Sequence, residues 1–248
     1  MSGTFGVVAK KNCQEDLFYG TDYHSHLGTQ FAGLAVYGRE LTRKIHDIKG
    51  SQFKAKFHED YLKMQGDKGI GVISARDEQP IVMNSKLGSF AIVTDGFIDN
   101  AEKLAKELFK KGSSFSEVAE GKINFVEMAA KIIISGKTIT EGIEKVFSKI
   151  QGSATLLLLN KEGIYACRDR LGLTPLVIGK KGSSWAVSTE SSAFLNLGYK
   201  LVKHLEPGEI ILITRRGLKI KRKGAKANQI CSFLWVYTGF PASNYEAI

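Results

Sequence analysis

The start of the chain carries the residue types whose chemistry is easiest to name. Ser2 directly follows Met1, and a small residue in second place lets an aminopeptidase remove the methionine. The stretch behind it, Gly3–Ala9, is apolar and punctuated by glycine, which predicts a buried strand. An N-terminal hydroxyl held at a strand end can act as a nucleophile whose own α-amine is the base. Ser2 is therefore a candidate nucleophile, although any N-terminal strand can begin in this way.

Other reactive residue types lack the neighbours that their chemistry would need. His24 and His26 have no acidic or thiol companion nearby, so a turn or cap role is favoured over a metal site. Gly69 and Gly71 lack the third glycine and the Lys-Ser/Thr pair of a phosphate loop. The remaining candidates are interpreted as structural: Cys167 as a small buried hydrophobe, and Glu190 and Glu209 as turn or cap residues. We predict no metal and no cofactor.

The composition is that of an ordinary globular protein. Of its 248 residues, 43% are apolar and 24% charged, and no apolar run reaches membrane-spanning length. With no leader-like start, we expect a cytoplasmic protein that does not enter a membrane. The three cysteines are too widely spaced for a disulfide framework or a zinc cluster. The net charge of +10 lies largely in turns, which favours a solvated surface or a docking face for an acidic partner over nucleic-acid binding.

Strand-like and helix-like patterns divide the chain into blocks. Helices are expected at 12–23 and 51–65 and across the block 99–149. Strands are expected at 31–37, 40–49, 68–74 and 88–94, and then at 154–160, 164–167, 175–178, 185–188, 210–214 and 218–221. The strand 88–94 is expected to end at a turn made by Asp95-Gly96. The short hairpin spacings predict two mainly antiparallel sheets with helices packed outside them.

Several of these segments together resemble the N-terminal glutaminase domain of amidophosphoribosyltransferases. These enzymes are class II glutamine amidotransferases of the N-terminal-nucleophile (Ntn) hydrolase superfamily. The opening Ser2–Gly6 is similar to the family's Cys-Gly-Ile-Phe-Gly, and His26–Gly33 is similar to His-Arg-Gly-Gln-x-x-Ala-Gly. Arg168–Leu176 resembles Arg-Asp-Pro-x-Gly-x-Arg-Pro-Leu. Further stretches match in order: Thr189-Glu190-Ser191, Pro207-Gly208-Glu209, and Cys231–Ser243, which resembles the end of that domain.

The resemblance covers nearly the whole chain and implies its fold class. The expected fold is α+β, a four-layer α/β/β/α sandwich with the nucleophile at a strand end between the sheets. We expect this amidotransferase-like domain to span residues 1–230, followed by a C-terminal extension over 231–248.

The same resemblance assigns the catalytic positions. Ser2 stands at the nucleophile position, Asp95 at the position of the oxyanion-binding Asn, and Gly96 at that of the backbone N–H donor. A serine hydroxyl has a much higher pKa than a cysteine thiol and is the poorer nucleophile. An ionised Asp95 only accepts hydrogen bonds, so it would repel a developing oxyanion. Asp95 could instead hold the N-terminal ammonium of Ser2 in an ion pair.

The substrate-side positions also depart from the family pattern. The Arg that pairs with the glutamine carboxylate falls at Ser74, while Arg76 would face the same side of a continuing strand as a shifted clamp. Asp77 is the last residue of the segment that aligns with this family motif. The acid for the substrate α-amine falls at Asn124 or Phe125, depending on the alignment. Ser74, Arg76, Asp77 and Asn124 are therefore the predicted substrate-binding residues.

Because several parts of one site are altered while the scaffold motifs remain, we favour a glutaminase fold that no longer hydrolyses glutamine and acts by association. One alternative is an amidohydrolase that uses Ser2 on a non-glutamine amide. Another is a glutaminase subunit that supplies ammonia to a phosphoribosyltransferase in purine biosynthesis. Since the acidic pair and Gly/Thr-rich loop of phosphoribosyltransferases are not found, the expected partner is a separate phosphoribosyltransferase or amidotransferase chain. The sequence does not determine whether the chain forms a homo-oligomer.

Overall fold

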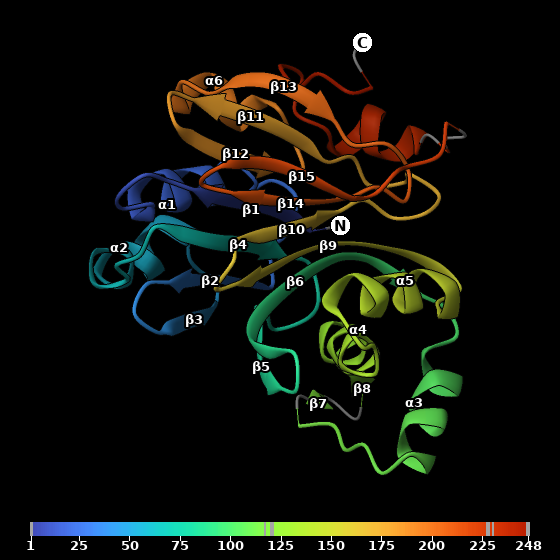
Figure 1. Cartoon of the computed structure of the whole chain (residues 1–248). Coiled ribbons are helices and arrows are strands. Elements are labelled where there is room, and N and C mark those ends of the chain that lie inside the picture. Colours follow the sequence, from blue (N-terminus) through green and yellow to red (C-terminus); the bar gives the residue numbers. More distant parts are fainter. Residues whose placement is uncertain (1, 117, 120–121, 227–228, 230, 247–248) are drawn as a thin grey trace.

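Two sheets stacked face to face organise the protein, and helices cover their outer faces (Figure 1). The computed structural model describes residues 2–116, 118–119, 122–226, 229 and 231–246. Within them, the paired strands run antiparallel throughout. The expected α+β class and four-layer sandwich are confirmed.

The first sheet has seven strands among the described residues, and it places the N-terminal strand near its centre. Its order is β13 (Lys200–His204), β11 (Val177–Lys181), β12 (Ser184–Ser188), β1 (Gly3–Val8), β4 (Lys68–Ser74), β2 (Phe31–Tyr37) and β3 (Leu41–Asp47). Because β1 pairs with β12 on one side and β4 on the other, the start of the chain is held between two strands.

The second sheet has six strands in the described part of the chain. Its order is β15 (Gly217–Arg222), β14 (Ile210–Thr214), β10 (Ile164–Cys167), β9 (Gly152–Asn160), β6 (Gly88–Ile98) and β5 (Ile81–Ser85). The layer between the two sheets is filled by apolar side chains that alternate along the strands, as buried faces require. Val72 of β4, Val93 of β6 and Leu157 of β9 are examples, and each is fully buried.

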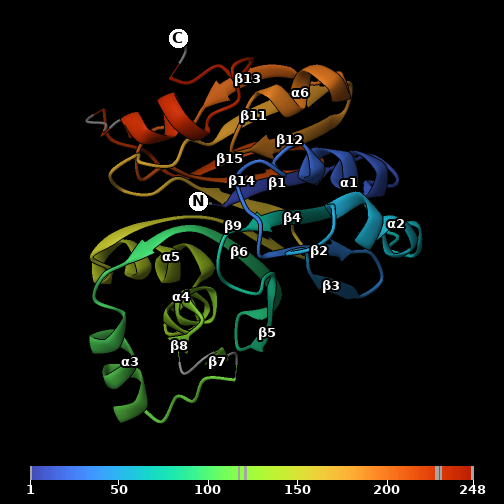
Figure 2. The same cartoon turned by 180° about the vertical axis from the view of Figure 1, so that it is seen from behind.

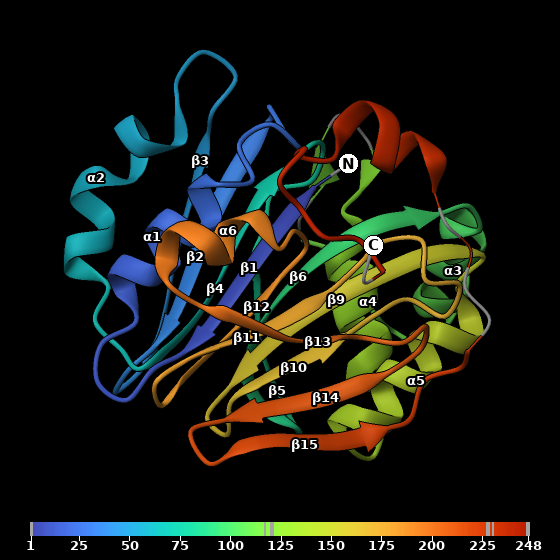
Figure 3. The ribbon, with the colours of Figure 1, turned by 90° about the horizontal axis from the view of Figure 1, so that it is seen from above.

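Each sheet has its own set of helices on the outer face, as the view from above shows (Figure 3). The first sheet packs against α1 (Gln14–Asp22), α2 (Phe53–Lys63) and α6 (Ser192–Leu197). The second packs against α3 (Ala101–Lys110), α4 (Phe125–Ile134) and α5 (Ile139–Lys149). From behind, α3 and the small hairpin of β7 (Val118–Ala119) and β8 (Lys122–Ile123) lie at the outer edge of this layer (Figure 2). No helix in the described part of the chain is long and apolar enough to cross a membrane.

Most of the expected strands and helices are present, with a few differences. The strand expected at 175–178 begins two residues later. The elements β5, α6 and β13 were not anticipated, nor was the β7–β8 hairpin inside the expected helical block 99–149. Gly69 and Gly71 lie inside β4 and not in a phosphate loop. A Cβ atom at Gly71 would lie 2.0 Å from Thr21 Oγ1 of α1, so this glycine allows the helix to pack closely on the sheet.

The expectation of a turn at Asp95-Gly96 is wrong. The strand β6 continues to Ile98, with Asp95 opposite Thr155 and Gly96 opposite Ala154 of β9. Gly96 has φ +150°, and a Cβ atom there would lie 2.1 Å from the carbonyl oxygen of Ser153. The glycine therefore serves the close approach of two strands, and the ladder to β9 overrides the local turn preference of the dipeptide.

Replacement of Gly96 by alanine should destabilise the fold by roughly 1–3 kcal/mol, because the side chain would collide with Ser153 and strain the backbone. The measurement is the free energy of unfolding in urea. The matched control is Gly50→Ala, since a Cβ atom at Gly50 would meet nothing within 4 Å. Equal stability of the two variants would contradict this interpretation.

Candidate functional site

The predicted nucleophile and oxyanion positions meet across the two sheets. The main-chain nitrogen of Ser2, directly before β1, donates a hydrogen bond of 2.7 Å to Asp95 Oδ1 on β6. The side-chain oxygen of Ser2 accepts a longer bond of 3.3 Å from the N–H of Ala75. Ser2 is 8% exposed and Asp95 5% exposed, so the contact is buried. Met1 lies outside the described residues, and its removal stays a prediction.

The second carboxylate oxygen of Asp95 is also satisfied by the protein. Thr174 Oγ1 donates to Asp95 Oδ2 over 3.2 Å. Burial raises the pKa of Asp95, and the bonds from Ser2 and Thr174 offset part of this effect. Thr174 was not among the predicted site residues. The sequence did carry a signal for it, since threonine stands where the matching motif of the resembled family has arginine.

Ser74, at the predicted position of the carboxylate clamp, is committed to local structure. It is 1% exposed, donates to the Asp77 carbonyl over 2.7 Å and accepts from Gln79 Nε2 over 3.2 Å. Gln79 in turn exchanges two hydrogen bonds with the backbone of Thr94 on β6. Nothing in the sequence pattern singled out Gln79, which ties the loop after β4 to the second sheet.

The expectation that Arg76 continues a strand on the same side as Ser74 is wrong, since β4 ends at Ser74. Arg76 Nε lies 3.1 Å from Asp77 Oδ2, and its guanidinium carbon lies 3.9 Å from the ring centroid of Phe125. The ion pair and the stacking hold the guanidinium against its own neighbours. Burial raises the pKa of Asp77, while Arg76 acts in the opposite direction.

Asn124 caps a helix and is not free to bind an amine. Its Oδ1 accepts from the N–H groups of Val126 and Glu127 at the start of α4. Its Nδ2 donates to the Glu78 carbonyl over 2.8 Å. All of its described polar bonds thus serve the fold, which is the ordinary role of asparagine at an N-cap.

A cleft of about 1270 Å³ lies beside this region, and only some of the predicted site residues line it. Arg76, Asp77 and Asn124 line it, together with residues of α3. Ser2 and Asp95 are not among its lining residues. Three of the four predicted substrate-side residues thus line the cleft, and the fourth, Ser74, is buried. Ser2 does not line the cleft, but its neighbour Ala75, which donates to the Ser2 side chain, does.

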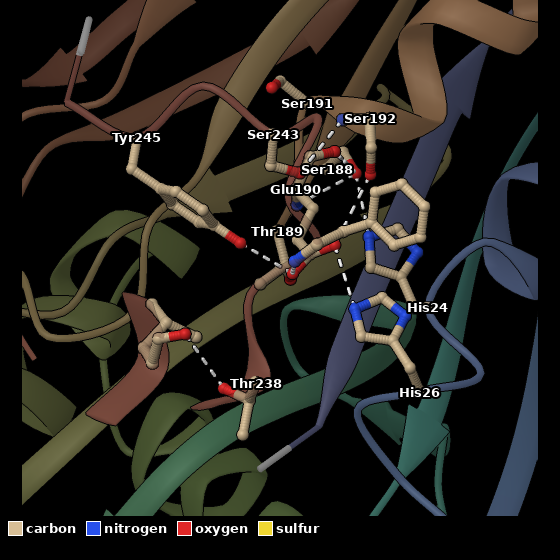
Figure 4. Close-up of polar contacts among 12 residues, drawn as sticks. His24, His26, Ser188, Thr189, Glu190, Ser191, Ser192, Thr238, Ser243 and Tyr245 are labelled. Atoms are coloured by element: carbon tan, nitrogen blue, oxygen red, sulfur yellow. Dashed lines mark hydrogen bonds and ion pairs between the residues drawn. The ribbon is translucent and has the colours of Figure 1, made fainter. Parts of the chain in front are cut away.

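The two histidines serve different partners, as Figure 4 shows. His24 Nδ1 lies 2.8 Å from the Gly20 carbonyl oxygen, and its Nε2 lies 3.0 Å from Ser188 Oγ. His26 Nε2 lies 3.1 Å from Glu190 Oε2. No group of three metal-ligating side chains occurs within the described ranges. Burial lowers the pKa of His24 to about 4, so the ring is neutral at pH 7.

Glu190, which was interpreted as a turn or cap residue, makes more contacts than that role requires. It is 1% exposed and accepts from the Tyr245 hydroxyl over 2.7 Å and from the Phe240 N–H over 3.1 Å. It therefore joins the C-terminal segment to the first sheet. Glu209 caps a turn by accepting from the Glu206 N–H, and burial raises the pKa of the Cys167 thiol well above its ordinary value.

Comparison with known proteins places this geometry in a family. A family model described as a glutamine amidotransferase domain matches residues 68–196, more than half of the chain. The chain belongs to the glutamine amidotransferase domain family. Amidophosphoribosyltransferase of Bacillus subtilis is 28% identical over 99% of this chain and 53% of its own length, and that of Mus musculus is 27% identical over 98% and 55%.

Solved structures agree with this assignment of the amidotransferase domain. Glutamine phosphoribosylpyrophosphate amidotransferase of B. subtilis, complexed with ADP and GMP, superposes with a TM-score of 0.87 at 27% identity, over 99% of this chain and 55% of that one. A structure described as the allosteric regulatory enzyme of purine biosynthesis gives a TM-score of 0.89 at 26% identity, over 99% and 54%. The chain spans about half the length of the curated relatives that it matches.

The buried neutral His24 should make stability depend on pH. Its folded-state pKa of about 4 lies below the ordinary value of 6.5, so only the unfolded state gains a proton between these values. Stability should therefore fall by about 3 kcal/mol as the pH drops from 7.5 to 4, beyond what other groups contribute. Urea unfolding of wild type and His24→Gln measures the difference in slope. His58→Gln, at an exposed histidine, is the control and should keep the wild-type slope; the same slope in His24→Gln would contradict the prediction.

Proposed function

We propose that this glutamine amidotransferase domain does not hydrolyse glutamine and acts by association with another protein chain. One observation carries the proposal: Asp95 stands at the predicted oxyanion position, with Oδ1 2.7 Å from the nitrogen of Ser2. Acyl transfer needs a hydrogen-bond donor where negative charge develops. A carboxylate supplies none when ionised.

The expected magnitude of this effect supports the proposal. Removal of one oxyanion donor typically lowers the turnover rate about a hundredfold or more. When ionised, Asp95 also places a negative charge beside the reacting centre, which adds electrostatic repulsion to the lost donor. Serine in place of cysteine weakens the nucleophile in addition.

The substrate-side groups support the same proposal because each is already engaged. Ser74 bonds to Asp77 and Gln79, Arg76 is paired and stacked, and Asn124 caps α4. Ser74 and Asn124 are buried, so a bound glutamine would have to displace their internal partners, whereas Arg76 is half-exposed at the cleft and is held only by its neighbours Asp77 and Phe125. The alternative of a non-glutamine amidohydrolase meets the same objection at Asp95, since any amide substrate forms an oxyanion.

The partner proposed is a separate phosphoribosyltransferase or amidotransferase chain. Its support is similarity: the chain matches proteins named amidophosphoribosyltransferase over 53% and 55% of their length. A role connected with purine biosynthesis is proposed through such a partner. Co-purification from the native cell tests this part, and a strictly solitary monomer there would contradict it.

We predict no ammonia release from glutamine and no covalent adduct at Ser2 after incubation with a diazo-ketone analogue of glutamine. Enzyme-coupled ammonia detection and intact-mass spectrometry measure the two outcomes. The B. subtilis amidophosphoribosyltransferase, treated in parallel, is the positive control for both reagents. An adduct at Ser2, or ammonia release that a Ser2→Ala variant loses, would contradict the proposal.

A further inference from the structure

The C-terminal segment 231–246, here called the strap, lies across one end of the layered body formed by residues 2–226. In Figures 1 and 3 it lies beside the N-terminal end of β1. It contains one short helix, which begins at residue 232 and is π-helical over Leu234–Thr238, and it has no strand within its described residues. Because no strand pairing holds it, its attachment must come from side-chain and turn contacts.

The first anchor of the strap is Glu190, which follows β12 and lies just before α6. This carboxylate is buried, and the strap supplies two of its donors, the Tyr245 hydroxyl at 2.7 Å and the Phe240 N–H at 3.1 Å (Figure 4). The body supplies His26 Nε2 at 3.1 Å and Ser192 Oγ at 3.4 Å. Without the strap, a buried carboxylate would lose two of these bonds.

The second anchor is Arg168, which follows β10 and is 2% exposed. Its Nη1 lies 3.2 Å from Glu246 Oε2, and its Nη2 contacts the other oxygen of the same carboxylate. The guanidinium also donates to the carbonyl oxygens of Leu205 and Gly172. Glu246 thus provides the opposite charge for a buried cation, and removing such a partner is strongly destabilising.

The two anchors have opposite charges and contact consecutive strap residues. Glu190 binds the hydroxyl of Tyr245, and Arg168 binds the carboxylate of Glu246. Directly before Tyr245, the Asn244 N–H donates to Ser191 Oγ over 2.6 Å. The side chains around Glu190 and Arg168 therefore determine which residue types the bound segment must carry and at which positions. Polar contacts are directional, whereas apolar burial is not.

The apolar contribution to this attachment is small, and much of it faces outward. Leu234 and Tyr245 are buried, but Phe233 is 58%, Val236 71% and Tyr237 76% exposed. These three side chains lie within five residues of one another and leave an apolar patch on the outer side of the strap. A segment held mainly by polar anchors can leave its site without unfolding the core between the sheets.

We propose that the surface around Glu190 and Arg168 is a recognition site for a Tyr-Glu segment, and that it can take the strap of a second copy of this chain in place of its own. Complementarity is already shown by the seated strap, and a second copy carries the same segment. Reciprocal exchange gives a closed two-fold dimer in which each copy completes the other's site. The proposal does not depend on whether the domain hydrolyses glutamine.

The test uses the full chain and a fluorescent peptide with the sequence of residues 231–246. Wild type should bind the peptide weakly, because its own strap competes at high effective concentration. The double variant Tyr245→Phe/Glu246→Gln weakens the strap and leaves the site intact, so it should bind the peptide about tenfold more tightly or better. Adding Glu190→Gln to the double variant should return peptide affinity to the weak wild-type level. Adding Glu162→Gln instead, at an exposed acid, is the control and should leave the tighter peptide binding unchanged.

A peptide that carries the same two substitutions separates recognition from any folding defect, since it leaves the protein unaltered. It should not bind the double variant. Equal binding of the two peptides, or no binding of the wild-type peptide, would overturn the recognition site.

Light scattering after size exclusion tests the second copy. We expect a dimer fraction that grows with wild-type concentration and is lost in the double variant. A wild-type monomer at every concentration, with no exchange between mass-labelled copies, would overturn the assignment of the second copy as occupant.

Discussion

The hydrogen bond from the Ser2 nitrogen to Asp95 is the contact on which the interpretation of this protein depends. It joins the start of β1 in one sheet to the middle of β6 in the other, at a point that is nearly closed to solvent. In the proposed assignment, a carboxylate in this place holds the chain start in position and, when ionised, offers no donor to a developing oxyanion. Thr174 completes the arrangement as a neutral donor to the second oxygen.

The surrounding residues are consistent with a site whose polar groups serve the fold. In an active site, polar groups are held ready for a substrate and are often strained or incompletely bonded. Here Ser74, Arg76 and Asn124 each have internal partners, and neither Ser2 nor Asp95 is among the residues that line the neighbouring cleft. The amidotransferase scaffold is thus retained, and these contacts support the proposal that its polar groups serve the fold.

Sequence patterns predicted the sandwich well because apolar alternation and the order of motifs are properties of long segments. They failed where tertiary pairing overrides a local preference: Asp95-Gly96 has turn chemistry, yet pairing with β9 keeps it in a strand. The resemblance correctly paired Ser2 with Asp95, but no spacing rule could show that Arg76 would turn back onto Asp77 and Phe125. Gln79 was missed, and Glu190 was interpreted only as a turn or cap residue, because their roles depend on partners distant in sequence.

The most direct test of the role of Asp95 is made in a background with a stronger nucleophile. Hydrolysis of a small activated ester would be compared between Ser2→Cys and Ser2→Cys/Asp95→Asn, because such a substrate needs an oxyanion donor but no carboxylate clamp. We predict that the asparagine variant is about a hundredfold faster, in line with one restored donor. Equal rates for the two proteins would contradict the claim that this carboxylate silences the site.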